Sequence, residues 1–328
     1  MNWFVYSLAG VLLFTTELLY ISLAVQFRII DRPNERSSHT RPTVRGGGIV
    51  FWVAALAAFF VDGLPHPCFF AGLTLIASIS FLDDLFSLPG RYRFLVQLVS
   101  VGLLWLDLPD PLLYVGWVPA GLLVGCGVVN ACNFMDGING MTAFYGLVNV
   151  LTLLWLNGVM DFTDPALLGF SAAGLLVFAF FNARRKAVCF AGDVGSVSLA
   201  FILLFLLVQL VMKSGNPIYL LFLAVYGADS GLTIVHRLLN RENIFRPHKL
   251  HLFQLLVHRL HWPHLRVAGL YALVQAVINA LILWLEPQGR TIQILAGVAI
   301  PAGLIVIYEW SRSRLIKQKP QREAVAVG

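Results

Sequence analysis

Two adjacent carboxylates, Asp83 and Asp84, stand at the end of an apolar run, in the stretch FLDDLFSLPGRYRFLVQ. Neighbouring carboxylates repel each other, so the pair needs a cation or a proton nearby. Hard oxygen ligands suit Mg²⁺, and Arg91 and Arg93 follow closely enough to hold phosphate oxygens. The pair therefore predicts a magnesium and phosphate site. The alternative is a helix end wetted by lipid headgroups, with the two arginines acting only as membrane anchors.

Amide and carboxylate side chains recur every third residue in NACNFMDGING, at Asn130, Asn133, Asp136 and Asn139. If this stretch is helical, all four lie on one side of the helix. The glycines within it let a backbone or a ligand approach closely. Because the segment has no lysine or arginine, membrane anchoring does not explain it, and we expect it to be functional.

A further acid, Asp193, stands between Gly192 and Gly195 just before another apolar run. This pattern resembles a ligand-bearing turn. The equal alternative is an N-cap, because an Asp at a helix start satisfies backbone N–H groups that have no partner in the helix. Capping and metal ligation are compatible with each other.

Histidines and cations alternate in the segment RPHKLHLFQ, which contains Arg246, His248 and His251. A zinc site is one interpretation, but no cysteine or carboxylate lies at ligand spacing within the surrounding loop. Arginine, histidine and lysine together better suit several phosphate oxygens. Three further histidines are expected to be interfacial only: His258, His261 and His264.

The first polar segment, 28–45, adds His39 and Arg45 before three consecutive glycines. It is either part of the same site or a charged loop that ends in a glycine turn.

One acid lies inside an apolar run, Asp229, with Thr233 and Arg237 four and eight residues later. An acid within a membrane is costly and usually functional, and an ion pair with Arg237 is the alternative. Glu17 and Glu309 lie on apolar runs that carry no motif, so we assign them no role.

The composition indicates which kind of fold must position these side chains. Of 328 residues 58% are hydrophobic and 12% are charged, against about 45–50% and about 25% in soluble domains. One soluble core cannot bury that much apolar surface. The composition therefore excludes a disordered or nucleic-acid-binding protein and indicates an integral membrane protein with several spans.

Eleven apolar runs divide the chain, near 3–27, 46–61, 68–82, 94–106, 112–129, 141–157, 166–181, 195–212, 217–235, 267–285 and 291–310. We expect an all-α, polytopic membrane helix bundle with about eleven transmembrane helices, ten being the alternative count. Residues 1–328 then form one integral membrane domain, and residues 311–328 are its basic cytoplasmic tail.

The charges between the runs predict the orientation. With the N-terminus outside, the inner connections and the C-terminal tail carry 21 lysines and arginines, and the outer connections carry two. This asymmetry is typical of the positive-inside rule. It places the N-terminus outside, the C-terminus inside, and the polar clusters on the cytoplasmic side.

No GxxxxGK[ST], GxSxG or HExxH motif occurs. What remains is acid and base at a lipid boundary, where a phosphate-bearing lipid could meet a soluble phosphorylated donor. The rival class is a membrane carrier for a lipid phosphate or sugar phosphate. Carriers place polar residues near the bilayer midplane, which disfavours that class here.

Five motifs in order carry a family resemblance over about residues 28–260: HTRPTVRGGGI, FLDDLFSLPGRYRFLVQ, NACNFMDGING, FAGDVGS and RPHKLHLFQ. The chain resembles the polyprenyl-phosphate N-acetylhexosamine-1-phosphate transferases (glycosyltransferase family 4). That family includes the bacterial phospho-MurNAc-pentapeptide translocase and the undecaprenyl-phosphate GlcNAc-1-phosphate transferases. The short RPHxxH form is most similar to the O-antigen-type enzymes.

The resemblance implies an Mg²⁺-dependent phosphoglycosyl transferase, with Mn²⁺ as the alternative ion. Its expected substrates are a UDP-N-acetylhexosamine and undecaprenyl phosphate, with UMP as the released product. It further implies a place in the bacterial inner membrane, surrounded by membrane lipid, with a cytoplasmic active site and a role in O-antigen or similar polysaccharide synthesis. A homodimer is also expected.

The resemblance also assigns roles to residues. The expected catalytic residues are Asp83, Asp84, Asp136 and His248. The expected substrate-binding residues are His39, Arg45, Arg93, Asn133, Arg246 and His251. The expected metal ligands are Asp84 and Asp193. Asp83 is the candidate for deprotonating or orienting the lipid phosphate, and a covalent phosphoaspartate is the alternative route.

The chain departs from the family pattern at two places. Asn139 stands where the family often has the last aspartate of DGIDG, so we assign no catalytic role to that position. The Pro-Ala-Lys that commonly precedes FxGD is absent, and Arg184, Arg185 and Lys186 stand nearby instead.

Overall fold

A computed structural model describes residues 3–33, 41–108, 111–112, 114–243 and 248–317. The longer helices in these ranges are α1 (Trp3–Gln26), α2 (Ile49–Val61), α3 (Pro67–Phe86), α4 (Gly90–Leu103), α5 (Val118–Met135), α6 (Met141–Met160), α7 (Pro165–Asn182), α8 (Gly192–Ser214), α9 (Ala224–Leu239), α10 (Leu252–Leu260), α11 (His264–Leu285) and α12 (Arg290–Lys317). Three short 3₁₀ segments, η1 (Leu104–Asp107), η2 (Val115–Trp117) and η3 (Pro217–Leu223), extend or precede them.

Each of the eleven apolar runs contains one of these helices, so the predicted helical membrane architecture is confirmed. Within the described ranges nine helical stretches are long and apolar enough to cross a membrane. Helices α2 and α4 are shorter, at 13 and 14 residues. The number of spans therefore stays a prediction. One helix, α10, has no counterpart among the apolar runs. It lies in a polar loop where we expected no helix.

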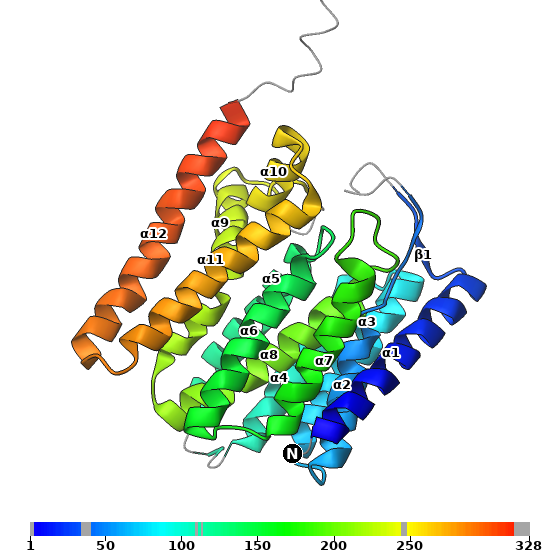
Figure 1. The fold of residues 1–328 in the computed structure, drawn as a ribbon. Helices are drawn as coiled ribbons and strands as arrows, with labels where there is room; N and C mark the ends of the chain where they lie inside the picture. Colours follow the sequence, from blue (N-terminus) through cyan, green and yellow to red (C-terminus); the bar gives the residue numbers. More distant parts are fainter. Residues whose placement is uncertain (1–2, 34–40, 109–110, 113, 244–247, 318–328) are drawn as a thin grey trace, which may run out of the picture.

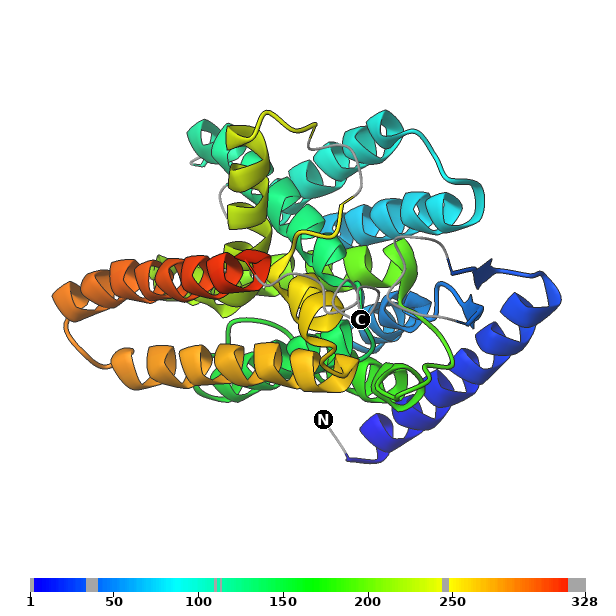
Figure 2. The same cartoon turned by 90° about the horizontal axis from the view of Figure 1, so that it is seen from above.

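The bundle is built around α8, which is buried over almost its whole length. Helices α2, α3, α5 and α6 pack against it, and Figure 2 shows the other helices arranged around this centre, with α1 at one edge. Helix α12 differs from α8, because most of its apolar side chains are exposed and only Tyr308 and Leu315 among its residues are buried. A helix that is apolar on every side suits the interior of such a bundle, and an exposed apolar helix suits contact with lipid.

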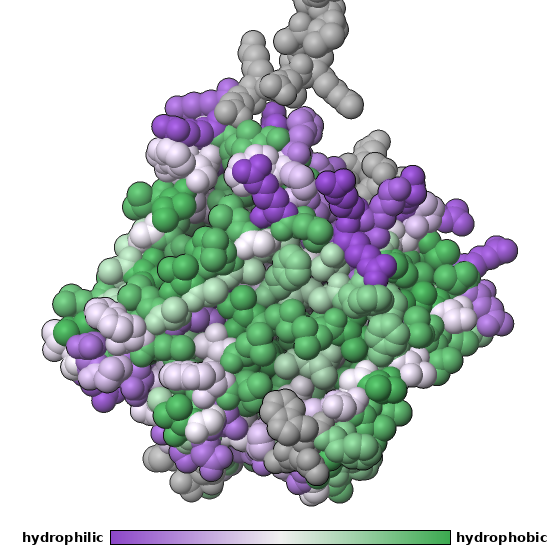
Figure 3. Space-filling view, in the orientation of Figure 1, coloured by the Kyte–Doolittle hydropathy of each residue, from purple (hydrophilic) through white to green (hydrophobic). Residues whose placement is uncertain are grey.

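Consecutive long helices alternate in direction (Figure 1), so the polar connections fall into two sets at opposite ends of the bundle. One end carries the loops before α2, α4, α8 and α11 together with α10. Figure 3 shows hydrophilic residues gathered along that edge above a broad hydrophobic band. Which side of the membrane this end faces stays a prediction.

Backbone contacts join two loops at this end. Strands β1 (Ile30–Asp31) and β2 (Thr43–Val44) form a small antiparallel pair, and Val44 also bridges to Cys189 before α8. The N–H groups of Gly47 and Gly48 donate to Phe190 and Ala191. A Cβ on Gly48 would lie 2.3 Å from the Cα of Gly195. Only glycine therefore lets the starts of α2 and α8 meet backbone to backbone.

Candidate functional site

Three carboxylates from two helices, which we call the acid cluster, lie together at the polar end of the bundle. Asp83 and Asp84 come from the last turn of α3 and Asp193 from the first turn of α8. The Asp84 carboxylate accepts the backbone N–H groups of Asp193 and Val194, each at 3.0 Å. Because the first N–H groups of a helix have no partner within it, Asp84 caps α8 from a different helix.

Gly192 makes this arrangement possible. Its φ is +70°, in the left-handed region that favours glycine, and a Cβ there would lie 2.5 Å from Oδ2 of Asp84. The Gly-Asp pair of the sequence therefore has two separate functions. The glycine admits the Asp84 carboxylate to the helix start, and Asp193 joins the acid cluster.

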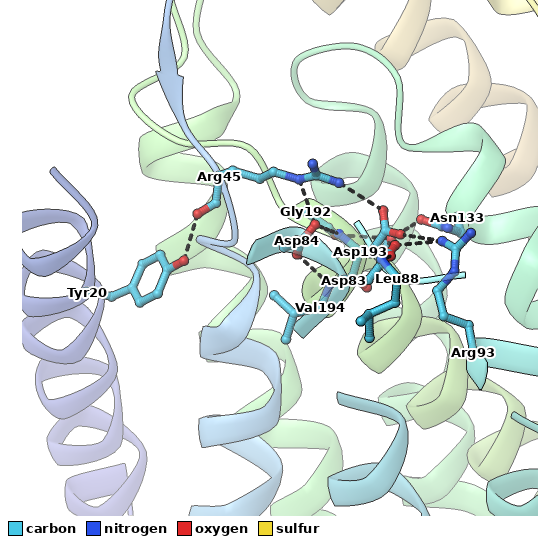
Figure 4. Close-up of polar contacts among 11 residues, drawn as sticks. Tyr20, Arg45, Asp83, Asp84, Leu88, Arg93, Asn133, Gly192, Asp193 and Val194 are labelled. Carbon is cyan, nitrogen blue, oxygen red and sulfur yellow. Dashed lines mark hydrogen bonds and ion pairs between the residues drawn. The ribbon is translucent and has the colours of Figure 1, made fainter. Parts of the chain in front are cut away.

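Two arginines neutralise most of the negative charge (Figure 4). Arg45 Nε lies 2.6 Å from Asp84 Oδ1, and its Nη2 lies 3.6 Å from Asp193 Oδ1. Arg93 Nη1 lies 2.7 Å from Asp83 Oδ2 and 3.1 Å from Asp193 Oδ2. The side chain of Asp84 is fully buried, whereas those of Arg45 and Arg93 are about one-third exposed. The arginines therefore form the side of the cluster that an incoming anion meets first.

A hydrogen bond from helix α1 holds the backbone at Arg45. The Tyr20 hydroxyl donates to the carbonyl oxygen of Arg45 at 2.7 Å. A Cβ on Gly46, whose φ is +86°, would lie 2.3 Å from the same hydroxyl oxygen. The glycines after the first polar segment therefore allow α1 to pack directly against the backbone at Arg45, and Arg45 itself joins the acid cluster.

The carboxylates suit a divalent cation in their donor type. One nitrogen, Arg93 Nη1, already lies between Asp83 and Asp193, so these two carboxylates share a positive charge. In the described ranges no three His, Cys, Asp or Glu side chains surround a common metal position. Mg²⁺ commonly takes only one or two carboxylates and completes its shell with substrate phosphates and water, and this cluster fits that mode.

The Asn and Asp side chains of 130–139 do not share one face, because α5 ends at Met135. Asn130 donates to Gln97 within the bundle at 2.9 Å. Asn133 accepts the Ser196 hydroxyl at 2.6 Å, which places it beside the first turn of α8 and the acid cluster. Asn139 lies beyond the helix end and donates to the Arg184 carbonyl oxygen at 2.8 Å. The periodic pattern therefore did not predict the arrangement correctly.

Asp136 follows α5 and accepts a hydrogen bond from the Thr142 hydroxyl. Burial raises the pKa of Asp136 to about 6, and the negative charge of Asp84 adds to the rise, while the Thr142 hydrogen bond opposes it. A carboxyl group with such a pKa can exchange a proton near neutral pH.

Residues 248–251, which we call the histidine loop, lie over the end of α5. The rings of His248 and His251 are 4.9 Å apart between centroids, and His251 is 6.1 Å from the Phe134 ring. Burial lowers the pKa of His248 to about 4, and His251 and Arg237 act in the same direction. Within the described residues neither histidine makes a hydrogen bond or ion pair with the acid cluster. His39 and Arg246 lie outside the described residues.

Two acids have partners that the sequence did not predict. Glu17, to which we assigned no role, is fully buried, and its Oε1 lies 3.2 Å from the Cys189 sulfur in the loop before α8. The apolar run that contains Glu17 did not predict this contact. Asp229 contacts α10, while Arg237 donates to Glu242 and to the Asn243 carbonyl oxygen.

Known proteins are similar to this chain over most of its length. The profile described as glycosyl transferase family 4 matches residues 66–211. A probable undecaprenyl-phosphate N-acetylglucosaminyl 1-phosphate transferase of Bacillus subtilis (strain 168) is 26% identical over 86% of this chain and 86% of its own length. A decaprenyl-phosphate N-acetylglucosaminephosphotransferase of Mycolicibacterium smegmatis is 26% identical over 87% of this chain and 82% of its own.

An undecaprenyl-phosphate alpha-N-acetylglucosaminyl 1-phosphate transferase of Escherichia coli (strain K12) is 25% identical over 76% of both chains. The family match runs from α3 through α7 and includes all but the last three residues of α8, so it contains the acid cluster, Arg93, Asn133 and Asp136. Over residues 66–211 the chain is therefore similar to glycosyl transferase family 4.

Proposed function

We propose that this protein transfers an N-acetylhexosamine 1-phosphate from a UDP-sugar to undecaprenyl phosphate and releases UMP. The single observation that carries the proposal is the acid cluster with Arg45 and Arg93 at one polar end of a membrane bundle. Its relatives are named as polyprenyl-phosphate N-acetylglucosamine-phosphate transferases. A polar site at a membrane boundary suits a reaction between a soluble donor and a lipid acceptor.

The reaction exchanges one pyrophosphate bond for another. An oxygen of the lipid phosphate forms a bond to the phosphorus that carries the sugar, and the bond from that phosphorus to UMP breaks. Asp83 accepts or orients the proton of the lipid phosphate. Arg45 and Arg93 hold donor phosphate oxygens, for which a guanidinium is well suited. The exposed position of both arginine heads supports that role.

Asp84 and Asp193 are the proposed ligands of Mg²⁺, with Mn²⁺ as the alternative. The ion would neutralise negative charge on the pyrophosphate. Asp84 also caps α8, so the same carboxylate would tie the ion to the helix that presents Asp193. Asn133, next to this helix start, is a proposed contact for the donor, and Asp136 is a proposed proton acceptor.

The histidine loop, with Arg246, is the proposed site for the remaining donor phosphate oxygens, and His39 is a further proposed contact. His248 Nδ1 accepts the Leu250 N–H at 3.3 Å, so the neutral ring carries its proton on Nε2. That N–H is available as a donor to a phosphate oxygen.

We further propose that the site faces the cytoplasm across a bacterial inner membrane and that the product enters O-antigen or similar polysaccharide synthesis. The alternative, a carrier for a lipid phosphate or sugar phosphate, requires polar groups near the bilayer midplane. The charged cluster of this protein lies at helix ends, which favours an enzyme.

A donor panel tests the proposal. Purified protein in detergent is mixed with undecaprenyl phosphate, Mg²⁺ and one UDP-N-acetylhexosamine at a time, and UMP and lipid product are measured without ATP. We expect UMP release with at least one donor and re-formation of the UDP-sugar when UMP is added to the lipid product. Release of UDP, a requirement for ATP, or no product with any donor would contradict the proposal.

A further inference from the structure

Asp229 of α9 lies beneath the histidine loop and is almost completely buried, with 2% of its surface exposed. We propose that Asp229 is a positioning residue, which holds the first turn of α10 and thereby sets the place of the histidine loop over the site. The inference rests on the proposed function in one respect, because it takes the loop to bind donor phosphates.

Each oxygen of the Asp229 carboxylate accepts one backbone N–H group, which can only donate, and one hydroxyl group. Oδ1 accepts the Leu252 N–H at 2.9 Å, and Oδ2 accepts the Phe253 N–H at 3.2 Å. The Tyr271 hydroxyl donates to Oδ2 at 2.6 Å, and the Thr233 hydroxyl donates to Oδ1 at 3.3 Å. An amide side chain at this position would direct an NH₂ group toward one set of these donors.

The two N–H groups belong to the start of α10, a helix of nine residues. A helix this short is marginal by itself, and a carboxylate at its N-terminus both satisfies free N–H groups and opposes the positive end of the helix dipole. The cap comes from another helix, so it fixes α10 in space as well as stabilising it.

His251 connects this cap to the loop. It is the N-cap residue of α10, and its backbone N–H donates to Gln254 Oε1 at 3.3 Å. Its Nδ1 lies 3.4 Å from Asp229 Oδ1, and its ring packs against His248. A displacement of the α10 start would therefore move both histidines of the loop.

Helix α10 packs against α9, α11 and α12, and part of its surface lines a cavity. The Phe253 ring packs closely against Gly137, because a Cβ added to Gly137 would lie 2.8 Å from the ring. A cavity of about 400 Å³ lies between α10 and the helices α9, α11 and α12, and Leu252, Leu256 and Tyr271 are among the residues that line it. The polar contacts to Asp229 therefore restrain the first turn of α10 in addition to its apolar packing.

The test compares Asp229→Asn with Asp229→Glu. The amide matches the shape of the acid but meets donors with its NH₂ group, whereas Glu keeps both acceptor oxygens and is longer. We expect Asp229→Asn to raise the KM for the UDP-sugar roughly three- to thirtyfold, with a smaller effect on kcat and a KM for undecaprenyl phosphate within about twofold of wild type. Asp229→Glu is expected to restore part of the loss. A residue that only fills space predicts the reverse order, with Asn the better replacement.

A second measurement does not depend on catalysis. Hydrogen–deuterium exchange at the amides of 252–254 should be faster in Asp229→Asn than in wild type. Tyr271→Phe removes one hydrogen bond to the carboxylate with little change of shape. It should also raise the exchange rate at 252–254, by less than Asp229→Asn does. This variant provides the test if Asp229→Asn folds poorly. The matched control is Tyr226→Phe, which removes a buried hydroxyl of α9 that donates to Met141 and should leave these amides and the donor KM unchanged.

The outcomes separate the two proposals. If wild-type protein makes no product with any donor, the proposed function fails, while the exchange data still decide whether Asp229 holds α10. Unchanged exchange at 252–254 and unchanged donor KM in both Asp229→Asn and Tyr271→Phe would overturn the positioning role. Equal effects of Tyr226→Phe on the exchange rates would overturn it as well.

Discussion

The three acids of the cluster have different partners, so they should respond differently to substitution. Asp84 is bound to two backbone N–H groups of α8 and to Arg45. Asp83 accepts the Leu88 N–H at 2.6 Å and pairs with Arg93. Asp193 interacts with both arginines. Asp84 therefore combines the capping of another helix with a proposed part in the chemistry.

The first prediction separates these roles. Asp84→Asn and Asp193→Asn should each lower the rate of UMP release on the order of 10²–10³-fold, because a charged ligand of Mg²⁺ is lost, and both should need more Mg²⁺. Asp84→Asn should also lower the free energy of unfolding by about 1 kcal/mol, since the amide is a weaker cap for α8. Asp83→Asn should lower turnover with nearly normal Mg²⁺ dependence.

These effects are measured as UMP release against Mg²⁺ concentration, together with thermal unfolding. Glu309→Gln is the control, because Glu309 is exposed and pairs with His236 away from the acid cluster. Glu17→Gln is unsuitable, because Glu17 is buried against Cys189. Normal Mg²⁺ dependence in Asp84→Asn and Asp193→Asn would contradict the metal assignment.

The second prediction concerns pH. The pKa of Asp136 is about 6 in the folded protein, above the usual value of 3.8. The folded state therefore favours the protonated form, and this group makes the protein more stable as pH falls from about 6 toward 4. If the carboxylate is the active form, kcat/KM should fall as pH drops below about 6.

Asp136→Asn checks this assignment, because its amide oxygen can still accept the Thr142 hydroxyl while the titration is removed. The pH profile of the variant should lose the acidic limb near pH 6, with lower activity at every pH and no loss of stability at pH 7. An acidic limb that persists at the same pH would assign the titration to another group.

At the level of elements, the site depends on the close approach of the α3 end and the α8 start. The third prediction tests this approach through Gly192, which combines a positive φ with a position 2.5 Å from Asp84 for an added Cβ. Gly192→Ala should lower the free energy of unfolding by roughly 1–3 kcal/mol and reduce UMP release strongly, because the Asp84 cap must move.

Gly215 provides the matched control for Gly192. It has a similar φ of +64°, and nothing lies within 4 Å of an added Cβ. Gly215→Ala should therefore show the backbone strain alone, with lower thermal stability and normal activity per folded molecule. Equal activity losses in the two variants would mean that the contact with Asp84 is unimportant.

At the level of the whole molecule, alternating helices bring the loops that carry the described site residues to one end of the bundle (Figure 1). The fourth prediction fixes the side of the membrane that this end faces. In a variant without native cysteines, an impermeant thiol reagent added outside should label Gln288→Cys. Gly90→Cys and Leu250→Cys should react only after the membrane is opened. The reverse pattern would contradict the orientation derived from the basic residues.

The sequence alone determined the helical membrane architecture and the polar segments that form the site. An apolar run is a local property, so each helix built on such a run could be located without knowledge of its neighbours, whereas α10 in its polar loop could not. Because consecutive spans alternate in direction, every second connection lies at the same end. The acid pair, Asp193 and Arg45 could therefore be expected on one face, although their partners could not be named.

Only the tertiary structure decided how these residues pair. Asp84 caps a helix that begins 108 residues later in the chain, and no local pattern encodes a contact between such distant segments. The same reason applies to Glu17 with Cys189 and to Asp229 with the start of α10. The end of α5 at Met135 separates Asn139 from Asn133, because the backbone leaves the helix where a neighbouring helix and loop supply other hydrogen bonds. Pairing of this kind depends on which helices pack side by side, and that is a property of the whole fold.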